Sequence, residues 1–426
     1  MAERPSTATV KGMNDILPPE VSKWQWIEEK ARSVLEAFSY RELRTPLLEY
    51  TPLFVRSVGE STDVVEKQMY TFDDRDGRSV SLRPEGTAPA VRAYLNESQW
   101  TKEPVTRWYY AGPMFRHERA QRGRLRQFHQ FGAEVFGIAE PTIDAEMLAM
   151  LVAMLVEMGI PRPALRVSLN CLGEPEERQA YRDAIHAYFG ARKDALDDDS
   201  RRRLDTNPLR ILDSKSPEVQ AVAAGAPEIL STLGQASQDR FARVRDGLDA
   251  LGVASTIDPR LVRGLDYYTG TIFEIRTDAG DLGAQNTICG GGRYDRLVES
   301  LGGPRVPALG FGMGVERVLL ALAEPAESFE PRLAIFFAPV GPAALAWSLP
   351  VAHRLRLAGI RVEVEHRPAS LKSLLKRADK LKARFAVIVG DAELASKKLV
   401  LKDLAAGRQH EVPEADLEAK VRQLVD

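Results

Sequence analysis

The chain has 426 residues, of which 44% are hydrophobic and 28% charged, and its formal net charge is -2. This composition is typical of a globular protein with two or three domains, and the near-neutral charge excludes a generally basic nucleic-acid coat. The two cysteines lie far apart in the sequence and suggest no disulfide framework. The six histidines show no zinc-ligand spacing, so we expect no metal site. The N-terminus lacks the apolar core of a signal peptide, and the longest apolar run, 147–156, is too short to cross a membrane, so a cytoplasmic enzyme is expected.

The first predicted element is an amphipathic helix over residues 21–38. Trp24, Ile27 and Ala31 recur there at helical spacing, after two prolines that suit a helix start. The ELRTPLLEY run that follows is typical of a strand interrupted by Pro46. A helix packed on a core explains these residues without any further function.

Residues 79–87, SVSLRPEGT, are predicted to form a strand that ends in a turn. Alternation along a strand would place Arg83, Glu85 and Thr87 on one side. A carboxylate beside a hydroxyl can accept the protons of an ammonium group. A surface turn would give the same pattern.

The next predicted element is an antiparallel hairpin of two strands, 106–115 and 126–136, with a polar loop between them. One face of the second strand carries a cation, an aromatic ring, an amide, a gap and a carboxylate: Arg126, Phe128, Gln130, Gly132 and Glu134. A purely structural face would more often carry Val and Ile, so we expect this face to hold a ligand.

Five arginines lie between positions 116 and 126, against the single acid Glu118. A solvated loop could have this composition, and a basic loop also suits a nucleic-acid backbone. Because the planar guanidinium group suits phosphate oxygens and the loop lies between the two functional-looking strands, we predict a polyphosphate site.

At this point the chain resembles a known family. GPMFRHER, followed by RQFHQFGAEVFG, resembles motif 2 of class II aminoacyl-tRNA synthetases in the form found in the histidyl-tRNA synthetase family. RPEGT resembles that family's histidine-binding loop, and the helix and strand before Pro46 resemble motif 1, which forms the family's dimer interface. Leu125 departs from the pattern, because many members carry an aromatic residue there.

After the hairpin, residues 141–158 predict a buried helix, and residues 170–252 predict a charge-rich helical insertion without strand alternation. Arg201, Arg202 and Arg203 are candidates for RNA contact, and a solvated helix face explains them equally well. The NPLRILDSK run resembles the insertion of the same family.

Residues 258–275, DPRLVRGLDYYTGTIFEI, are predicted to be a strand. Arg263 lies there among apolar and aromatic neighbours, and an unpaired buried guanidinium is costly, so we expect it to be paired or functional. Arg263 and Tyr268 are an odd number of positions apart, so both can face one site only if the strand bends near Gly264. LVRGLDYY and the later CGGGRYDRLV resemble the two motifs particular to the histidyl family.

The ALGFGMGVERVLLAL run predicts a glycine-rich strand that continues into an amphipathic helix. Its glycines fit neither a Walker loop nor a GxGxxG loop. It resembles motif 3 of class II synthetases, in which the arginine, here Arg317, serves ATP.

An acidic, proline-containing segment at 326–331 predicts a linker between a catalytic domain, 1–325, and a C-terminal α/β domain, 332–426. Four strands are predicted in the C-terminal domain, at 333–337, 360–364, 385–389 and 398–401. The helix predicted at 370–384 has a basic face that suits either solvent or RNA. The domain resembles the anticodon-binding domain of class II synthetases, which favours tRNA.

The resemblance implies an α+β catalytic domain with the class II antiparallel sheet of six or seven strands, in a homodimer. It implies a histidine–tRNA ligase, which joins L-histidine and ATP into histidyl-adenylate and then transfers the histidyl group to the 3′ end of tRNA(His). Mg²⁺ would accompany ATP. The alternative is the related regulatory subunit of ATP phosphoribosyltransferase, which would lack both an intact LVRGLDYY and the C-terminal domain. A purely RNA-binding protein would not need Glu85, Gln130, Glu134 and Arg263 together.

The resemblance also assigns the site. Arg263 and Arg116 would be catalytic, because they would neutralise the α-phosphate and the histidine carboxylate. Glu134 with Tyr268 would bond the two imidazole nitrogens, which predicts strong rejection of other amino acids and no editing domain. Histidine would contact Glu85, Thr87, Arg116, Gln130, Glu134, Arg263, Tyr267, Tyr268 and Tyr294. ATP would contact Arg116, Arg124, Phe128, Gln130 and Arg317.

Overall fold

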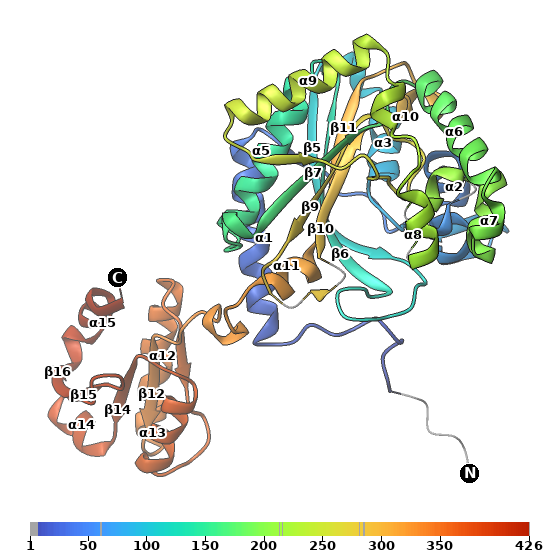
Figure 1. The fold of residues 1–426 in the computed structure, drawn as a ribbon. Helices are drawn as coiled ribbons and strands as arrows, with labels where there is room; N and C mark the ends of the chain where they lie inside the picture. Colours follow the sequence, from blue (N-terminus) through green and yellow to red (C-terminus); the bar gives the residue numbers. More distant parts are fainter. Residues whose placement is uncertain are drawn as a thin grey trace, which may run out of the picture. The chain divides into compact units, whose positions relative to one another are not determined.

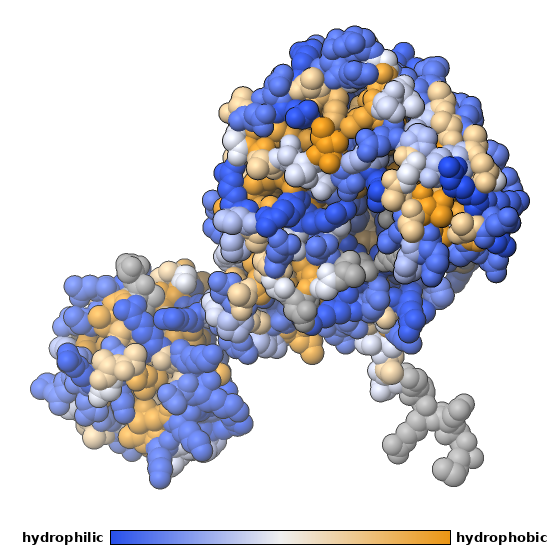
Figure 2. All heavy atoms as spheres, viewed as in Figure 1, coloured by the Kyte–Doolittle hydropathy of each residue, from blue (hydrophilic) through white to orange (hydrophobic). Residues whose placement is uncertain are grey.

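The computed structural model describes residues 7–59, 62–212, 214, 216–280, 282–283 and 286–425. The chain forms two compact units that divide between Ser328 and Phe329 (Figure 1). Each unit has its own hydrophobic core. On the face drawn in Figure 2, hydrophilic side chains cover most of both units.

An eight-stranded mixed sheet forms the centre of the first unit, in the order β1-β5-β6-β11-β10-β9-β7-β8 (Figure 1). Its six inner strands pair antiparallel: β5 (Thr106–Phe115), β6 (Gln127–Phe136), β11 (Ala308–Gly314), β10 (Thr287–Arg293), β9 (Thr269–Thr277) and β7 (Leu165–Cys171). The edge strands β1 (Arg41–Glu42) and β8 (Ser255–Ile257) are short and pair parallel with their neighbours. The predicted class is confirmed, and these two edge strands account for the larger, mixed sheet.

Helices cover the sheet and carry the connections. The buried helix α5 (Thr142–Glu157) packs against α1 (Glu20–Ala37) and α9 (Gln235–Ala250), which explains why its surface is apolar nearly all round. A separate three-stranded sheet, β2 (Leu48–Tyr50), β4 (Ser79–Leu82) and β3 (Thr71–Asp73), adjoins α2 (Thr51–Val58). The remaining α-helices of this unit outside the insertion are α3 (Thr87–Asn96), α4 (Gln99–Lys102), α10 (Leu297–Ser300) and α11 (Val315–Ala321).

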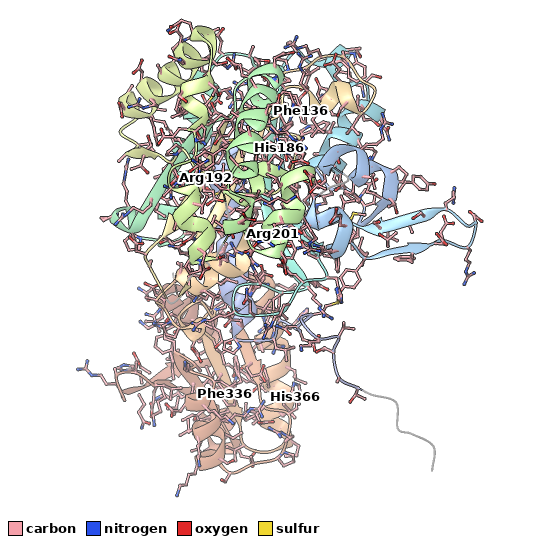
Figure 3. The ribbon with its side chains drawn as sticks, turned by 45° about the vertical axis from the view of Figure 1, so that its right-hand side comes forward. Phe136, His186, Arg192, Arg201, Phe336 and His366 are labelled. Atoms are coloured by element: carbon pink, nitrogen blue, oxygen red, sulfur yellow. The ribbon has the colours of Figure 1, made fainter. Side chains whose placement is uncertain are left out.

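A helical body separates β7 from α9. It contains α6 (Pro175–Gly190), α7 (Asp198–Thr206) and α8 (Pro217–Ala223). Figure 3 labels His186 on α6 and Arg201 on α7, and Arg201 donates to the carbonyls of Lys193 and Asp194 within the same body. Arg202 and Arg203 both lie within 2.8 Å of a carboxylate oxygen of Asp199.

Two predicted strands are wrong in their extent. β4 ends at Leu82 and Thr87 begins α3, so Arg83, Glu85 and Thr87 do not alternate along a strand. β9 begins only at Thr269, so Arg263 and Tyr268 lie in an irregular segment, and no bend in a strand is needed to bring them together. Pro259 in that segment has no backbone N–H to donate, and the carbonyls of Pro259 and Asp266 accept from the side chains of Asn170 and Arg178.

Lys23 joins the beginning of the first unit to its end. Its buried Nζ donates to the carbonyls of Leu319 at 3.2 Å, Leu322 at 3.4 Å and Glu324 at 3.0 Å. These carbonyls lie at the C-terminal end of α11, where a cation is stabilising.

The second unit is a five-stranded sheet in the order β13-β12-β14-β15-β16. β12 (Ile335–Pro339) pairs parallel with β13 (Val362–Val364) and β14 (Phe385–Val389), whereas β15 (Lys398–Asp403) and β16 (Gln409–Pro413) continue the sheet antiparallel. The sequence does not predict β16, because QHEVP is short and polar and exposes most of its residues. The helices are α12 (Pro342–Leu357), α13 (Leu371–Lys380), α14 (Asp391–Ser396) and α15 (Leu417–Val425). No helix among the described residues is long and apolar enough to cross a membrane.

Candidate functional site

A polar cavity of about 570 Å³ opens over the inner strands of the first unit. The hairpin β5–β6, the turn before α3, the segment 258–268 and the strands β9 to β11 all contribute to its walls. Ten of the predicted site residues line it: Glu85, Thr87, Arg116, Arg124, Phe128, Gln130, Arg263, Tyr267, Tyr268 and Arg317. Glu134 and Tyr294 do not line the cavity and lie in a layer beneath it.

The layer beneath the cavity is centred on the Glu134 carboxylate, which is fully buried. Its Oε1 accepts from Thr87 Oγ1 at 2.8 Å and from the Tyr110 hydroxyl at 2.9 Å, and its Oε2 accepts from the Tyr294 hydroxyl. Burial raises the pKa of Glu134 to about 8, although these three hydrogen bonds lower it. Near neutral pH this carboxyl group therefore takes up a proton.

Two glycines make this arrangement possible. Gly132 lies opposite Tyr110 across the hairpin, and a Cβ on Gly132 would lie 2.3 Å from the Tyr110 ring. Gly310 lies opposite Glu134, and a Cβ there would overlap the carboxylate. The gap noticed at Gly132 in the sequence is thus filled by Tyr110, which sequence reasoning missed and which also lines the cavity.

Glu85 is held by the start of helix α3. Its two carboxylate oxygens accept from the backbone N–H groups of Thr87 at 2.7 Å and Ala88 at 2.9 Å. These are unpaired donors of the first helical turn, where a negative charge is favourable. Each oxygen keeps a further lone pair for a ligand.

Arg116 lines the cavity together with Phe128. Its Nε donates to the Pro84 carbonyl at 2.8 Å, and its guanidinium carbon lies 5.3 Å from the centre of the Phe128 ring. One hydrogen bond therefore fixes the direction of the guanidinium, and its terminal nitrogens are positioned beside a flat aromatic surface.

Arg263 is positioned by Glu274 of β9 and by the glycine-rich strand β10. Its Nη1 lies 2.6 Å from Glu274 Oε1, and a Cβ on Gly290 would lie 2.4 Å from the guanidinium. The Nε of Arg263 is buried and has no hydrogen-bond partner within the described residues. A buried donor without a partner is costly, so this N–H is available for a ligand.

Arg317 and Arg124 lie at the end of the cavity nearest the motif 2 loop. Arg317, the third residue of α11, donates to the carbonyls of Gly123 at 3.1 Å and Thr287 at 2.5 Å. Arg124 Nη1 lies 3.6 Å from Glu118 Oε2. The structure thus brings the arginines of two distant sequence motifs to one end of the cavity.

The cavity wall contains further charged residues that sequence reasoning missed, namely Glu118, Glu274, Arg276 and Glu316. Glu274 was detectable as the only acid in the apolar run TIFEI, and the Glu316 side chain bonds His129 at 3.0 Å. With these, five arginines and four glutamates line the cavity. Because Glu85 is bonded to a helix N-terminus and Glu274 to Arg263, the remaining surplus of positive charge suits a polyanion beside a small zwitterion.

No group of three or more His, Cys, Asp or Glu side chains in the described part of the chain could hold a metal ion. The cavity carboxylates instead pair with arginine, histidine or backbone N–H groups.

Two family profiles together match most of the chain. The profile of the family described as Histidyl-tRNA synthetase matches residues 12–318, and the one described as Anticodon binding domain matches residues 335–424. A protein named Histidine--tRNA ligase from Sorangium cellulosum is 49% identical, over 98% of this chain and 96% of its own length. A second with that name, from Halorhodospira halophila, is 51% identical over 93% of each chain.

Solved structures give the same result. Apo histidyl-tRNA synthetase from S. aureus matches with a TM-score of 0.82 and 35% identity, over 98% of this chain and 100% of that one. A structure titled as an ATP phosphoribosyltransferase regulatory subunit/histidyl-tRNA synthetase from Bacillus halodurans has a TM-score of 0.63 at 20% identity, over 92% of this chain and 98% of that one, and shares the fold.

Proposed function

The chain belongs to the histidyl-tRNA synthetase family, and from this premise we propose how its cavity performs the reaction. The activity is that of an ATP-dependent histidine–tRNA ligase. It first joins L-histidine to ATP, with release of pyrophosphate, and then transfers the histidyl group to tRNA(His). The reading as a regulatory subunit is disfavoured by the intact LVRGLDYY at the cavity and by the anticodon-binding profile.

In the first step an oxygen of the histidine carboxylate forms a bond to the α-phosphorus, and the bond from that phosphorus to the bridging oxygen of pyrophosphate breaks. Both reactants are anions, so cations must offset their repulsion. Arg116 and Arg263 hold the carboxylate and the α-phosphate. The observation that carries this assignment is the buried Nε of Arg263, which has no hydrogen-bond partner in the described part of the chain.

ATP extends from this point along the motif 2 hairpin. Phe128 stacks on adenine, beside Arg116 and Gln130, and Arg124 with Arg317 binds the outer phosphates. Mg²⁺ would accompany ATP and offset part of the phosphate charge, while Glu118 and Glu274 of the cavity pair with arginines. Addition of EDTA in excess over Mg²⁺ should then abolish the exchange of pyrophosphate into ATP.

Histidine lies over the inner strands. Its ammonium group bonds Glu85, Thr87 and Gln130, and its carboxylate faces the two catalytic arginines. Glu134 and Tyr268 bond the ring nitrogens, and Tyr267 forms a wall. Tyr294, predicted as a second wall residue, lies beneath the cavity and bonds Glu134 instead. To reach the ring, Glu134 exchanges one of its three hydroxyl partners for the ligand. An analogue that cannot bond both sites leaves buried polar groups unpaired, which is the physical basis of strong rejection.

The C-terminal unit binds the anticodon region of the tRNA, through the basic face of α13 that carries Lys372, Lys376 and Lys380. The tRNA substrate also indicates the cytoplasm as the site of action.

We further propose a homodimer. Leu48, Tyr50 and Phe72 of the small sheet are each at least 44% exposed, and β3 exposes all three of its residues. Tyr50 and Phe72 lie at the same register position on the two strands that flank β4, both opposite Val80. Exposed apolar side chains gathered on one small sheet are typical of a protein interface. Sedimentation velocity should give a dimer, and Phe72→Glu should shift it towards monomer.

The decisive experiment is ATP–pyrophosphate exchange measured with each of the twenty amino acids. Exchange with histidine alone supports the adenylation reaction and the pocket together. Exchange with a different amino acid contradicts the Glu134–Tyr268 assignment and leaves the fold intact. No exchange with any amino acid would favour the regulatory subunit.

A further inference from the structure

The segment 258–268 carries three proposed ligand-binding residues, Arg263, Tyr267 and Tyr268, yet it belongs to no strand or helix. Its backbone is joined to the sheet by Asp258 N–H, which donates to Leu169 at 2.8 Å, and to α2 by Asp266 N–H, which donates to Val58 at 3.1 Å. Elsewhere along the segment, the side chains of Asn170 and Arg178 bond its carbonyl groups.

Arg178 bonds the end of this segment that faces the histidine pocket. Its Nη1 donates to the carbonyl of Asp266 at 2.8 Å and to that of Tyr268 at 3.2 Å, so the two bonds flank Tyr267. Its Nη2 lies 3.6 Å from Asp266 Oδ1. One planar guanidinium therefore bonds the peptide units on both sides of the Tyr267–Tyr268 peptide.

Arg178 is itself well fixed. It belongs to the first turn of α6, and a capping box of Glu174 and Glu177 defines the start of that helix. Asp266 also accepts from Asn207 at 3.5 Å, just after α7. The helical body thus bonds the segment from two of its helices.

A second cavity lies on the other side of Tyr267 and Tyr268 from the first cavity. It has a volume of about 430 Å³ and is lined by Arg178, Arg182, Tyr267 and Tyr268, among others. The two tyrosines also line the first cavity, so they form a wall with space on both sides. Both tyrosines are buried members of the core of the first unit, but they have space on two sides, so their orientation also depends on directional polar contacts.

We propose that Arg178 is a positioning residue, through which the helical body sets the Tyr267–Tyr268 wall of the histidine pocket. The inference rests on the proposed function, because it assumes that this pocket binds histidine. Arg178 does not touch the substrate. Its effect is to hold the tyrosines in the geometry that histidine requires, so it should act on histidine binding and leave the ATP end of the cavity unaffected.

The test is ATP–pyrophosphate exchange by the full chain with Arg178→Met, with Arg178→Lys as the conservative variant. Arg182→Met is the matched control, because Arg182 lies one turn further along α6, lines the same second cavity and donates to Thr206 of the helical body instead. We expect Arg178→Met to raise KM for histidine about tenfold or more, with KM for ATP changed by less than about twofold. Lysine should restore part of the loss, since it keeps a donor but not the fork.

Equal increases in both KM values, an equal effect of Arg182→Met, or a lowered Tm with KM for histidine unchanged would each overturn the proposal. If Arg178→Met does not fold, the comparison is made with Arg178→Lys and Arg182→Met. The increase in KM for histidine is then compared with the increase in KM for ATP in each variant. A wild-type chain without histidine-dependent exchange would instead refute the proposed function, and the two failures are therefore distinguishable.

Discussion

Glu134 combines complete burial with three hydroxyl donors, and its pKa lies near 8 instead of near its ordinary 4.5. Below pH 4.5 the carboxyl group is protonated in both the folded and the unfolded chain. Between pH 4.5 and 8 only the folded chain keeps the proton. The free energy of unfolding is therefore highest, as far as this group is concerned, below pH 4.5, and this contribution is lost as the pH rises through 8.

We predict that Glu134→Gln removes this dependence, because an amide does not titrate. From pH 5 to pH 8 the free energy of unfolding of the wild type should fall relative to that of the variant, by on the order of 1 kcal/mol per pH unit. Thermal unfolding of both proteins across this range measures the difference. Parallel curves would show that Glu134 is ionised in the folded chain at pH 5.

Arg263→Ala should lower histidine-dependent pyrophosphate exchange about 100- to 1000-fold, because a positioned cation at the developing charge is lost. Binding of tRNA, measured by filter retention, should persist. Arg260→Ala is the control, since Arg260 lies in the same segment but is exposed. Unchanged exchange in Arg263→Ala would remove Arg263 from the reaction.

At the scale of one element, strand β10 combines three glycines with close neighbours on its surface. We predict that Gly290→Ala lowers exchange about tenfold or more, because the new methyl group occupies the place of the Arg263 guanidinium. Gly190→Ala is the control: it ends α6 with nothing within 4 Å of the added carbon, so exchange should be unchanged. An active Gly290→Ala would mean that Arg263 has another productive position.

Helices and strands with a regular spacing of apolar and polar residues were predictable, and the turns between them were not. The hairpin β5–β6 was predictable because alternation along β6 puts Phe128 and Gln130 on one face, and both line the cavity. Thr87 reaches the cavity for another reason, the start of α3, and Tyr268 does so from an irregular segment. Long-range side-chain bonds determine those positions, and local sequence does not encode them.

At the scale of the whole molecule, the two units have separate cores, so each should fold without the other. We predict that a chain ending at Ser328 keeps exchange within about threefold of the full chain, while aminoacylation of tRNA(His) falls about 100-fold as anticodon contacts are lost. Both assays on the same preparation give the comparison. Equal loss in both would mean that the first unit depends on the second for its structure.

The family and the overall fold were predictable from the sequence, because several motifs occur in the expected order over most of the chain. The polar partners of the site were not predicted. The contact of Tyr110 with Glu134 depends on the register of the hairpin β5–β6, and that of Glu274 with Arg263 on the path of the irregular segment before β9. Sequence patterns identify the faces of elements, whereas sheet order determines which faces meet.

Lys23 of α1 binds carbonyls at the end of α11 and just after it, so the first and last α-helices described in the first unit lie together. A chain with adjacent ends can gain or lose a module there without opening its core. The same closeness would allow circular permutation, with a short peptide joining the region of Glu324 to the residues before Glu20 and new ends cut in an exposed loop. The anticodon-binding domain is thus attached at a position where it can be exchanged for another RNA-binding domain, in evolution or by design.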